Sequence, residues 1–94
     1  MKYAQKRDTS EKEIVAALEA LGFSVERMDH PADLIAGYKD QAFLIECKTP
    51  TKQGGKDKPT ARQLRFLSTW RGHYKVLRSA EEAMQWAQEI RGKQ

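Results

Sequence analysis

Residues 33–48, DLIAGYKDQAFLIECK, contain two apolar runs joined by a short polar segment. Two strand-like runs separated by a few polar residues are typical of an antiparallel β-hairpin. Asp40 lies in the connecting segment, where aspartate suits a turn position. The pattern therefore predicts strands at 33–37 and 42–48. With 94 residues in all, the chain has room for one domain and one modest core around this hairpin.

The second of these strands ends in charged residues, although strands of this kind usually run into a core. Side chains along a strand alternate between the two faces of the sheet. Glu46 and Lys48 therefore share one face, whereas Cys47 points to the opposite face with Phe43 and Ile45. Two opposite charges at one end of a buried strand make this position a candidate site.

Three S/T-x-x-E/Q patterns predict the starts of three helices, because each matches a capping box. These pairs are Ser10–Glu13, Thr60–Gln63 and Ser79–Glu82. The first helix is predicted over 10–21, with apolar residues at helical spacing and Gly22 as its C-terminal stop. Residues 1–9, before this helix, are predicted to be a short basic arm.

Two further strands complete the predicted order of elements. The segments 23–27 and 73–78 carry the alternation of short strands, and 49–60 is a polar loop with two prolines and two glycines. The whole chain is predicted to be a single domain, 1–94, with the order α-β-β-β-α-β-α. A hairpin followed by a helical crossover to a last strand predicts an α/β fold of α+β type, with a mixed sheet covered by helices.

The charge and cysteine content limit the classes of partner and compartment. The net charge of +4 favours an anionic partner, of which nucleic acid is the commonest. The single cysteine, Cys47, excludes an intrachain disulfide and a cysteine-based zinc site. The sequence shows no apolar leader and no apolar run near the roughly 20 residues that span a bilayer. We expect a cytoplasmic protein without a membrane partner.

Asp33 opens one strand of the hairpin and Glu46 ends the other, so both carboxylates fall at the same end of the pair. Carboxylates brought close together repel unless a cation lies between them. Mg²⁺ or Mn²⁺ would suit the position, since Mg²⁺ binds one or two carboxylates together with waters and a phosphate oxygen. Lys48 could orient an attacking water or stabilise charge on the phosphate. The backbone carbonyl of Cys47 is a further candidate ligand.

The spacing P-A-D-(x12)-E-C-K resembles the motif of the PD-(D/E)XK nucleases. The segments EIVAALEALGFSVERM, DLIAGYKDQAFLIECK, ARQLRFLSTWRG and KVLRSAEEA together resemble the stand-alone VRR-NUC nucleases of phages and prophages. The chain departs from the family pattern in having Pro31 two residues before Asp33 and no glycine there. The resemblance implies a restriction-endonuclease-like core and a metal-dependent endonuclease that acts on DNA, with catalytic residues Asp33, Glu46 and Lys48 and metal ligands Asp33, Glu46 and the Cys47 carbonyl.

The same resemblance implies two more catalytic residues. The first helix of the family brings a glutamate to the site; Glu13 is the best match and Glu11 the second. Gln63 matches a glutamine that lies beside the lysine. Capping boxes also explain Glu13 and Gln63 without any catalytic role, so both interpretations stay open for each residue.

The remaining candidates divide between surface, core and nucleic-acid contacts. His30 and His73 lack metal-ligand spacing and are predicted to be surface residues. The aromatic residues of the last two helices could stack on bases, but core positions are the preferred interpretation. Those residues are Phe66, Trp70 and Trp86. The loop lysines Lys52, Lys56 and Lys58 either contact DNA phosphates or solvate the loop.

Three functions are compatible with these features. The first is a Mg²⁺- or Mn²⁺-dependent endonuclease that is selective for DNA structure, similar to Holliday junction resolvases, because so small a chain has little surface for reading sequence. The second is a nucleic-acid-binding module of the same fold with weak or no catalysis, and the third is a small interaction protein. A homodimer is expected, since resolving a junction takes two symmetric cuts. Some residues of the last two helices are expected to lie exposed together: Phe66, Trp70, Met84 and Trp86.

Overall fold

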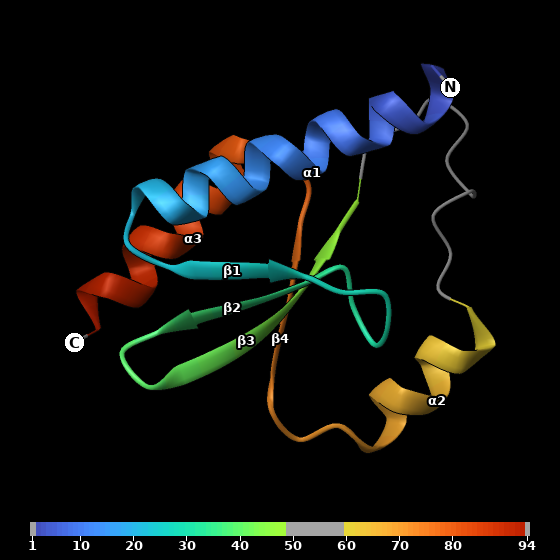
Figure 1. Ribbon diagram of the computed structural model, residues 1–94. Helices are drawn as coiled ribbons and strands as arrows, with labels where there is room; N and C mark the ends of the chain where they lie inside the picture. The colour runs from blue at the N-terminus through green and yellow to red at the C-terminus, as the bar shows by residue number, and fades with distance from the viewer. Residues whose placement is uncertain (1, 49–59, 94) are drawn as a thin grey trace.

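The predicted hairpin forms the centre of the computed structural model, which describes residues 2–48 and 60–93 (Figure 1). Strand β2, Leu34–Tyr38, pairs antiparallel with strand β3, Gln41–Cys47. Lys39 and Asp40 form the two-residue turn, both with positive φ (50° and 69°). Two positive φ values suit the tight turns that match the twist of a hairpin.

A strand on each side of the hairpin completes a four-stranded mixed sheet in the order β1-β2-β3-β4. Strand β1, Ser24–Arg27, pairs antiparallel with β2. Strand β4, His73–Leu77, pairs parallel with β3, so Leu44 lies beside Tyr74 and Glu46 beside Val76. The described residues form a small α+β domain of four strands and three helices, in the predicted order of elements.

Helices α1, Lys2–Ala20, and α3, Ala80–Gly92, cover one face of the sheet (Figure 1). The core lies between them and this face, because the side chains of β2 and β3 that point to it are apolar. Its buried members are Ile14, Ala17, Leu18, Phe23, Leu34, Ala36, Phe43, Ile45, Leu77, Ala83 and Ala87. The opposite face, here called the site face, bears Glu46 and is approached by the remaining helix, α2.

Helix α1 begins at Lys2, eight positions before the predicted start at Ser10. The prediction of an irregular arm over 1–9 and of a helix start at Ser10 is therefore wrong. Residues 2–9 include Ala, Gln, Lys and Arg, which are good helix formers, and contain no Gly or Pro. The helix therefore extends through the S-x-x-E pattern, and Ser10 and Glu13 lie inside it.

The other end of α1 closes as the sequence predicts. Gly22 has φ 96°, and its N–H donates to the carbonyl of Glu19 at 3.0 Å. The N–H of Phe23 donates to the carbonyl of Leu18 at 3.1 Å. These two bonds and the left-handed glycine make a Schellman motif, which satisfies the last carbonyls of the helix. Phe23 and Leu18 are both buried, so the motif also ties the helix end to the core.

Helix α2, Ala61–Thr69, begins with the predicted capping box of Thr60 and Gln63. No residue of α2 is buried, and Leu64 and Trp70 are 54% and 39% exposed. The prediction of core positions for Phe66 and Trp70 is therefore wrong, because α2 meets the sheet near one end only. The rings of Phe66 and Trp70 stack on each other at a centroid distance of 5.0 Å.

Helix α3 begins at the predicted N-cap, where the N–H of Glu82 donates to Ser79 Oγ at 3.1 Å. The Glu82 carboxylate accepts from the N–H of Arg78 at 2.9 Å, so the reciprocal bond lies one residue earlier than in a standard box. Trp86 packs against the core as predicted, whereas Met84 is 45% exposed. Of the four residues of which some were expected to lie exposed together, Phe66 and Trp70 stack on each other at the end of α2, and Met84 is exposed separately on α3.

Two further predictions concern the loop lysines and the absence of a membrane partner. The lysines Lys52, Lys56 and Lys58 lie outside the described residues. Among the helices of the described part of the chain, none has the length and apolar character that crossing a membrane requires.

The connection from α2 to β4 depends on a close approach between Trp70 and Gly72. Trp70 Nε1 donates to the carbonyl of His73 at 3.1 Å, which folds the indole back over the glycine. A Cβ added at Gly72 would overlap three atoms of that ring. Gly72→Ala should therefore lower the free energy of unfolding by about 1–3 kcal/mol, since the indole must move.

Gly92→Ala is the matched control, because a Cβ there meets nothing within 4 Å. We expect it to leave the free energy of unfolding unchanged or to raise it by up to about 1 kcal/mol. Urea denaturation followed by tryptophan fluorescence measures both variants. Equal stability of the two variants would contradict the packing of Trp70 on Gly72.

Candidate active site

Asp33 lies immediately before β2, where its backbone and side chain both bond to β3. Its N–H donates to the carbonyl of Ile45 at 3.1 Å. Its Oδ2 accepts a hydrogen bond of 2.7 Å from the backbone N–H of Cys47. The short bond to a carboxylate is of the charge-assisted kind, and it fixes Asp33 at the end of β3 that carries Glu46.

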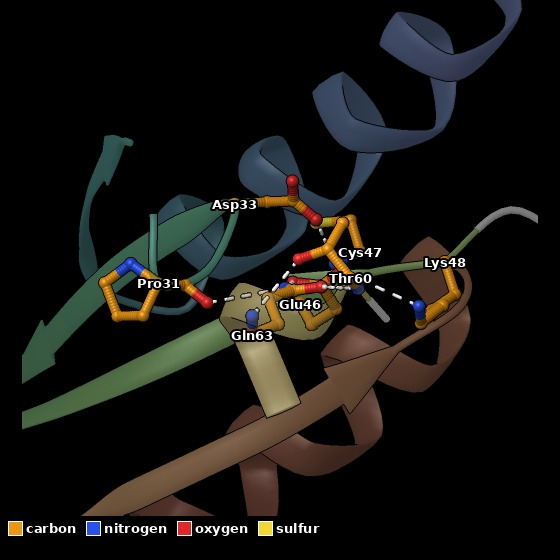
Figure 2. A network of polar contacts seen from close by, with 7 residues as sticks. All are labelled: Pro31, Asp33, Glu46, Cys47, Lys48, Thr60 and Gln63. Carbon is orange, nitrogen blue, oxygen red and sulfur yellow. Dashed lines mark hydrogen bonds and ion pairs between the residues drawn. The ribbon is translucent and has the colours of Figure 1, made fainter. Parts of the chain in front are cut away.

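Glu46 is the one charged residue among the buried residues of the described chain, with 8% of its surface exposed. It points to the site face because Ile45 and Cys47, its neighbours along β3, point to the core. Its Oε1 accepts a hydrogen bond from Gln63 Nε2 at 2.9 Å, and its Oε2 lies 3.7 Å from Lys48 Nζ (Figure 2). A buried carboxylate needs such partners, because an uncompensated charge in a dry environment is costly.

Lys48 directly follows the last residue of β3. Its N–H donates to the carbonyl of Leu77 at 3.0 Å, which continues the parallel pairing with β4. The pairing keeps the alternation of side chains, so Lys48 lies on the site face with Glu46 as predicted. Its side chain is 22% exposed and can reach a ligand at the surface as well as Glu46.

Gln63 serves both as the capping residue of α2 and as a partner of Glu46 (Figure 2). Its Oε1 accepts from the N–H of Thr60 at 3.4 Å, and the N–H of Gln63 donates to Thr60 Oγ1 at 3.1 Å. Its Nε2 donates to Glu46 and, at 3.4 Å, to the carbonyl of Pro31. The two interpretations of Gln63 are compatible, because an amide has an acceptor at one end and donors at the other.

Helix α2 also contacts the segment that precedes Asp33. Gln63 reaches the carbonyl of Pro31, and the ring of His30 packs edge-on against Phe66 at a centroid distance of 6.0 Å. His30 is half-buried beside this contact and is not part of the core. His73 is exposed, with its ring against Phe43 at 4.6 Å.

Tyr74 is a member of the site face that the sequence reasoning missed. It is paired with Leu44 in the parallel ladder of β3 and β4. This pair lies two residues before the pair of Glu46 and Val76, so all four side chains are on the same face. Burial, together with the negative charges of Glu46 and of Asp33, raises the pKa of Tyr74 to about 12. The phenol therefore stays protonated and can donate a hydrogen bond beside the carboxylates. The signal for it was the alternation in HYKVL, which identifies a face only once the parallel pairing with β3 is known.

The thiol of Cys47 points in one direction, and its backbone N–H and carbonyl point in another. The thiol packs against the core, as predicted. The N–H points toward Asp33. In a strand the N–H and C=O of one residue point to the same side, so the carbonyl of Cys47 opens toward Asp33 as well. This orientation suits the predicted role of that carbonyl as a ligand.

The sequence analysis ranked Glu13 before Glu11 as the glutamate of α1 at the site, and the positions of the two residues do not follow this order. Glu13 is exposed, on the side of the helix away from the core residue Ile14. Glu11 is half-buried and accepts from Arg27 Nε at 3.3 Å. Arg27 is paired with Leu34, the residue after Asp33. Of the two glutamates, Glu11 therefore has the closer link to the strand end that holds Asp33.

The donor set suits one Mg²⁺ or Mn²⁺ ion. No group of three His, Cys, Asp or Glu side chains with metal-binding geometry occurs within the described ranges. Magnesium does not require one, because it typically uses one or two carboxylates and completes its shell with waters and phosphate oxygens. Asp33, Glu46 and the carbonyl of Cys47 are the groups that could supply oxygen ligands to such an ion.

No protein-family model, curated protein or solved structure matches this chain. A function for the site must therefore be inferred from the geometry and chemistry of its own side chains.

The raised pKa of Tyr74 provides a test of this geometry. Glu46→Gln should lower the pKa of Tyr74 from about 12, because one negative charge beside the phenol is removed, but not to the usual 10.0, because the burial remains. NMR of ¹³Cζ-labelled tyrosine during a pH titration measures this value. Glu26→Gln, which neutralises an exposed carboxylate on β1, should leave it unchanged.

The same shift predicts a pH dependence of stability. The folded state holds the phenolic proton more tightly than the unfolded state, so this contribution is complete below about pH 10 and is lost as the pH rises to about 12. Tyr74→Phe should flatten the stability profile in that window. A wild-type Tyr74 that titrates near 10 would contradict the proximity of Tyr74 to the carboxylates.

Proposed function

We propose that this protein is a divalent-metal-dependent endodeoxyribonuclease that hydrolyses phosphodiester bonds of DNA. The observation that carries the proposal is the convergence of Asp33 and Glu46 at one sheet end, with Lys48 Nζ 3.7 Å from Glu46 Oε2. Two carboxylates and a lysine on one face are the groups that metal-assisted phosphodiester hydrolysis needs. The net charge of +4 favours the anionic substrate.

Each side chain of the site has a definite task in this reaction. Asp33 and Glu46 would hold Mg²⁺ or Mn²⁺ together with the Cys47 carbonyl. Such an ion, when bound, polarises the phosphodiester and makes an attacking water more acidic. The water oxygen bonds to phosphorus, one bridging P–O bond breaks, and the departing oxygen takes a proton. Lys48 carries the positive charge that orients the water or stabilises the phosphate in the transition state.

Gln63 and Tyr74 support these groups rather than react. The 2.9 Å bond from Gln63 Nε2 fixes Glu46 Oε1, which leaves Oε2 on the side of Lys48. The neutral phenol of Tyr74 offers a donor beside both carboxylates without adding charge. A site built in this way on strand ends is preorganised, since its members are held by backbone and capping bonds.

The resemblance to the PD-(D/E)XK nucleases, and within them to the stand-alone VRR-NUC proteins, supports the same proposal. Asp33, Glu46, Lys48 and Gln63 are the residues that the resemblance implied. Lys48 and Gln63 contact Glu46, and Asp33 accepts from the N–H of Cys47, the residue after Glu46. The element order α-β-β-β-α-β is that of the nuclease core. For the glutamate on α1, Glu11 is the better candidate by position, since Glu13 is exposed.

A second function is favoured by one observation about Glu46. Both of its carboxylate oxygens already have partners in the protein, Gln63 on Oε1 and Lys48 on Oε2. If this arrangement persisted with DNA bound, no cation would reach Glu46, and the chain would be a nucleic-acid-binding module with little or no catalysis. The salt bridge to Lys48 is the weaker of the two contacts and is the one that a cation must displace.

Cleavage of junction, flap and plain duplex DNA in Mn²⁺ distinguishes the two functions. We expect cleavage by the wild type, with a preference for branched DNA. Glu46→Gln and Lys48→Ala should each lower the rate by roughly 100-fold or more, because each removes a charge that acts at the reacting phosphate. Glu26→Gln, which removes an exposed carboxylate from β1, should cut at the wild-type rate.

Calorimetry with Mn²⁺ completes this test. Asp33→Asn and Glu46→Gln should weaken metal binding by roughly 10–100-fold, as expected when one of few ligands is lost. DNA binding without Mn²⁺ binding or cleavage would favour the binding module. Absence of both DNA binding and cleavage would exclude the nuclease and leave a protein-interaction domain.

We also propose that the active form is a homodimer, because a four-way junction needs two symmetric cuts and each chain offers one site. Sedimentation equilibrium at micromolar concentration should give twice the chain mass of 10.8 kDa. A monomer that nonetheless cuts a junction symmetrically would contradict this part of the proposal.

A further inference from the structure

Helix α2 and the turn after it carry positive charge and no negative charge. Residues 60–72 contain three arginines and no acidic residue. Arg62 and Arg65 are three positions apart, so they lie on the same side of the helix. Both are exposed. The segment thus presents two adjacent guanidinium groups to solvent.

The guanidinium groups of Arg62 and Arg65 have no acidic partner among residues 2–48 and 60–93. Neither Arg62 nor Arg65 forms an ion pair with an acidic side chain of the described residues, whereas Arg27 pairs with Glu11 at 3.3 Å. Their positive charge is therefore available to an external anion. Arginine suits phosphate in particular, because its planar fork donates two parallel hydrogen bonds.

The two arginines belong to the helix that contacts the site. Gln63, between them in sequence, donates to Glu46 at 2.9 Å. The inward side of α2 is made of Gln63, Phe66 and Leu67, which are half-buried, whereas Arg62 and Arg65 lie on an adjacent, exposed side of the helix. A phosphate bound at the carboxylates would therefore lie close to the first turn of α2.

The electrostatics of the site favour such a contact. Before a cation is bound, Asp33 and Glu46 repel the backbone of DNA, and Lys48 offers one positive charge against their two negative charges. Positive charge beside the carboxylates offsets this repulsion and attracts the flanking phosphates. Arg62 and Arg65 are offset by about 4.5 Å along the helix axis, near the 3.4 Å rise per phosphate of one DNA strand.

We propose that Arg62 and Arg65 on α2 form a DNA-backbone contact that holds the strand next to the scissile phosphate. The proposal rests on the proposed nuclease function and adds residues outside the catalytic group. The contact reads phosphates and not bases, so it serves every DNA sequence equally. The exposed Leu64 lies on the other flank of α2, so the surface used by the arginines is polar.

The test compares salt dependence of DNA binding, measured by fluorescence anisotropy with labelled duplex and junction DNA in EDTA. Each phosphate contact contributes about 0.9 to the slope of log K against log salt for duplex DNA. Arg62→Ala/Arg65→Ala should therefore lower the slope by roughly two and weaken binding at low salt by at least about tenfold. Circular dichroism checks that the variant is folded.

Arg91→Ala/Lys93→Ala is the matched control, because it removes the same charge from the exposed end of α3. Its slope should stay within about half a unit of the wild type. An equal loss of slope in both double variants would overturn the proposal, since it would show an effect of net charge alone. An unchanged slope in Arg62→Ala/Arg65→Ala would overturn it as well, even if the protein cuts DNA.

The remaining outcomes separate this inference from the nuclease function. A reduced slope in the α2 variant, with no cleavage by the wild type in Mn²⁺, would support the arginine contact and exclude catalysis. A wild type that binds no DNA at low salt would exclude both. A change from dimer to monomer in the α2 variant, with the slope unaltered, would assign this surface to a protein contact and overturn the inference.

Discussion

The Glu46 carboxylate is the constraint on which the rest of the site depends. It is 8% exposed at the end of an otherwise apolar strand, so it requires partners that offset the loss of water. Gln63 supplies a neutral donor at 2.9 Å and Lys48 a cation at 3.7 Å. The backbone N–H of Cys47, the next residue, in turn holds Asp33 at 2.7 Å. A carboxylate held in this way differs from the charged side chains of a solvated strand end, and this difference is the basis of the proposed cation site.

Helix α2 is the least embedded element that touches this group. None of its residues is buried, and it is attached through the Gln63 amide and the contact between His30 and Phe66. Elements with few buried apolar contacts open at low free energy. Motion of α2 would remove a hydrogen bond from Glu46 and would carry the arginines of the proposed DNA contact with it. If the proposed DNA contact forms, DNA binding and the hydrogen bonding of Glu46 would be linked through one short helix.

Several errors of the sequence analysis have a common physical origin. Ser10 and Glu13 satisfy a capping pattern, but the good helix formers upstream extend α1 to Lys2. Phe66 and Trp70 have helical apolar spacing, but α2 meets the sheet near one end, so Trp70 is 39% exposed. Local patterns report which face of an element is apolar, whereas the position of the element over the sheet decides how much of that face is covered. For Gln63, capping of α2 and contact with Glu46 occur together, because its amide has an acceptor at one end and donors at the other.

The sequence by itself determined the hairpin, the faces of β3, the caps at Thr60 and Ser79, and the meeting of Asp33, Glu46 and Lys48. These follow from short-range rules: alternation along a strand, turn residues and capping patterns act within a few positions of the chain. Only the tertiary structure decided that Gln63 bonds to Glu46, that Tyr74 shares their face, and that Glu11 rather than Glu13 lies toward the core. Those relations join residues that are distant in sequence, and they depend on strand register and helix placement, which packing of the whole core settles.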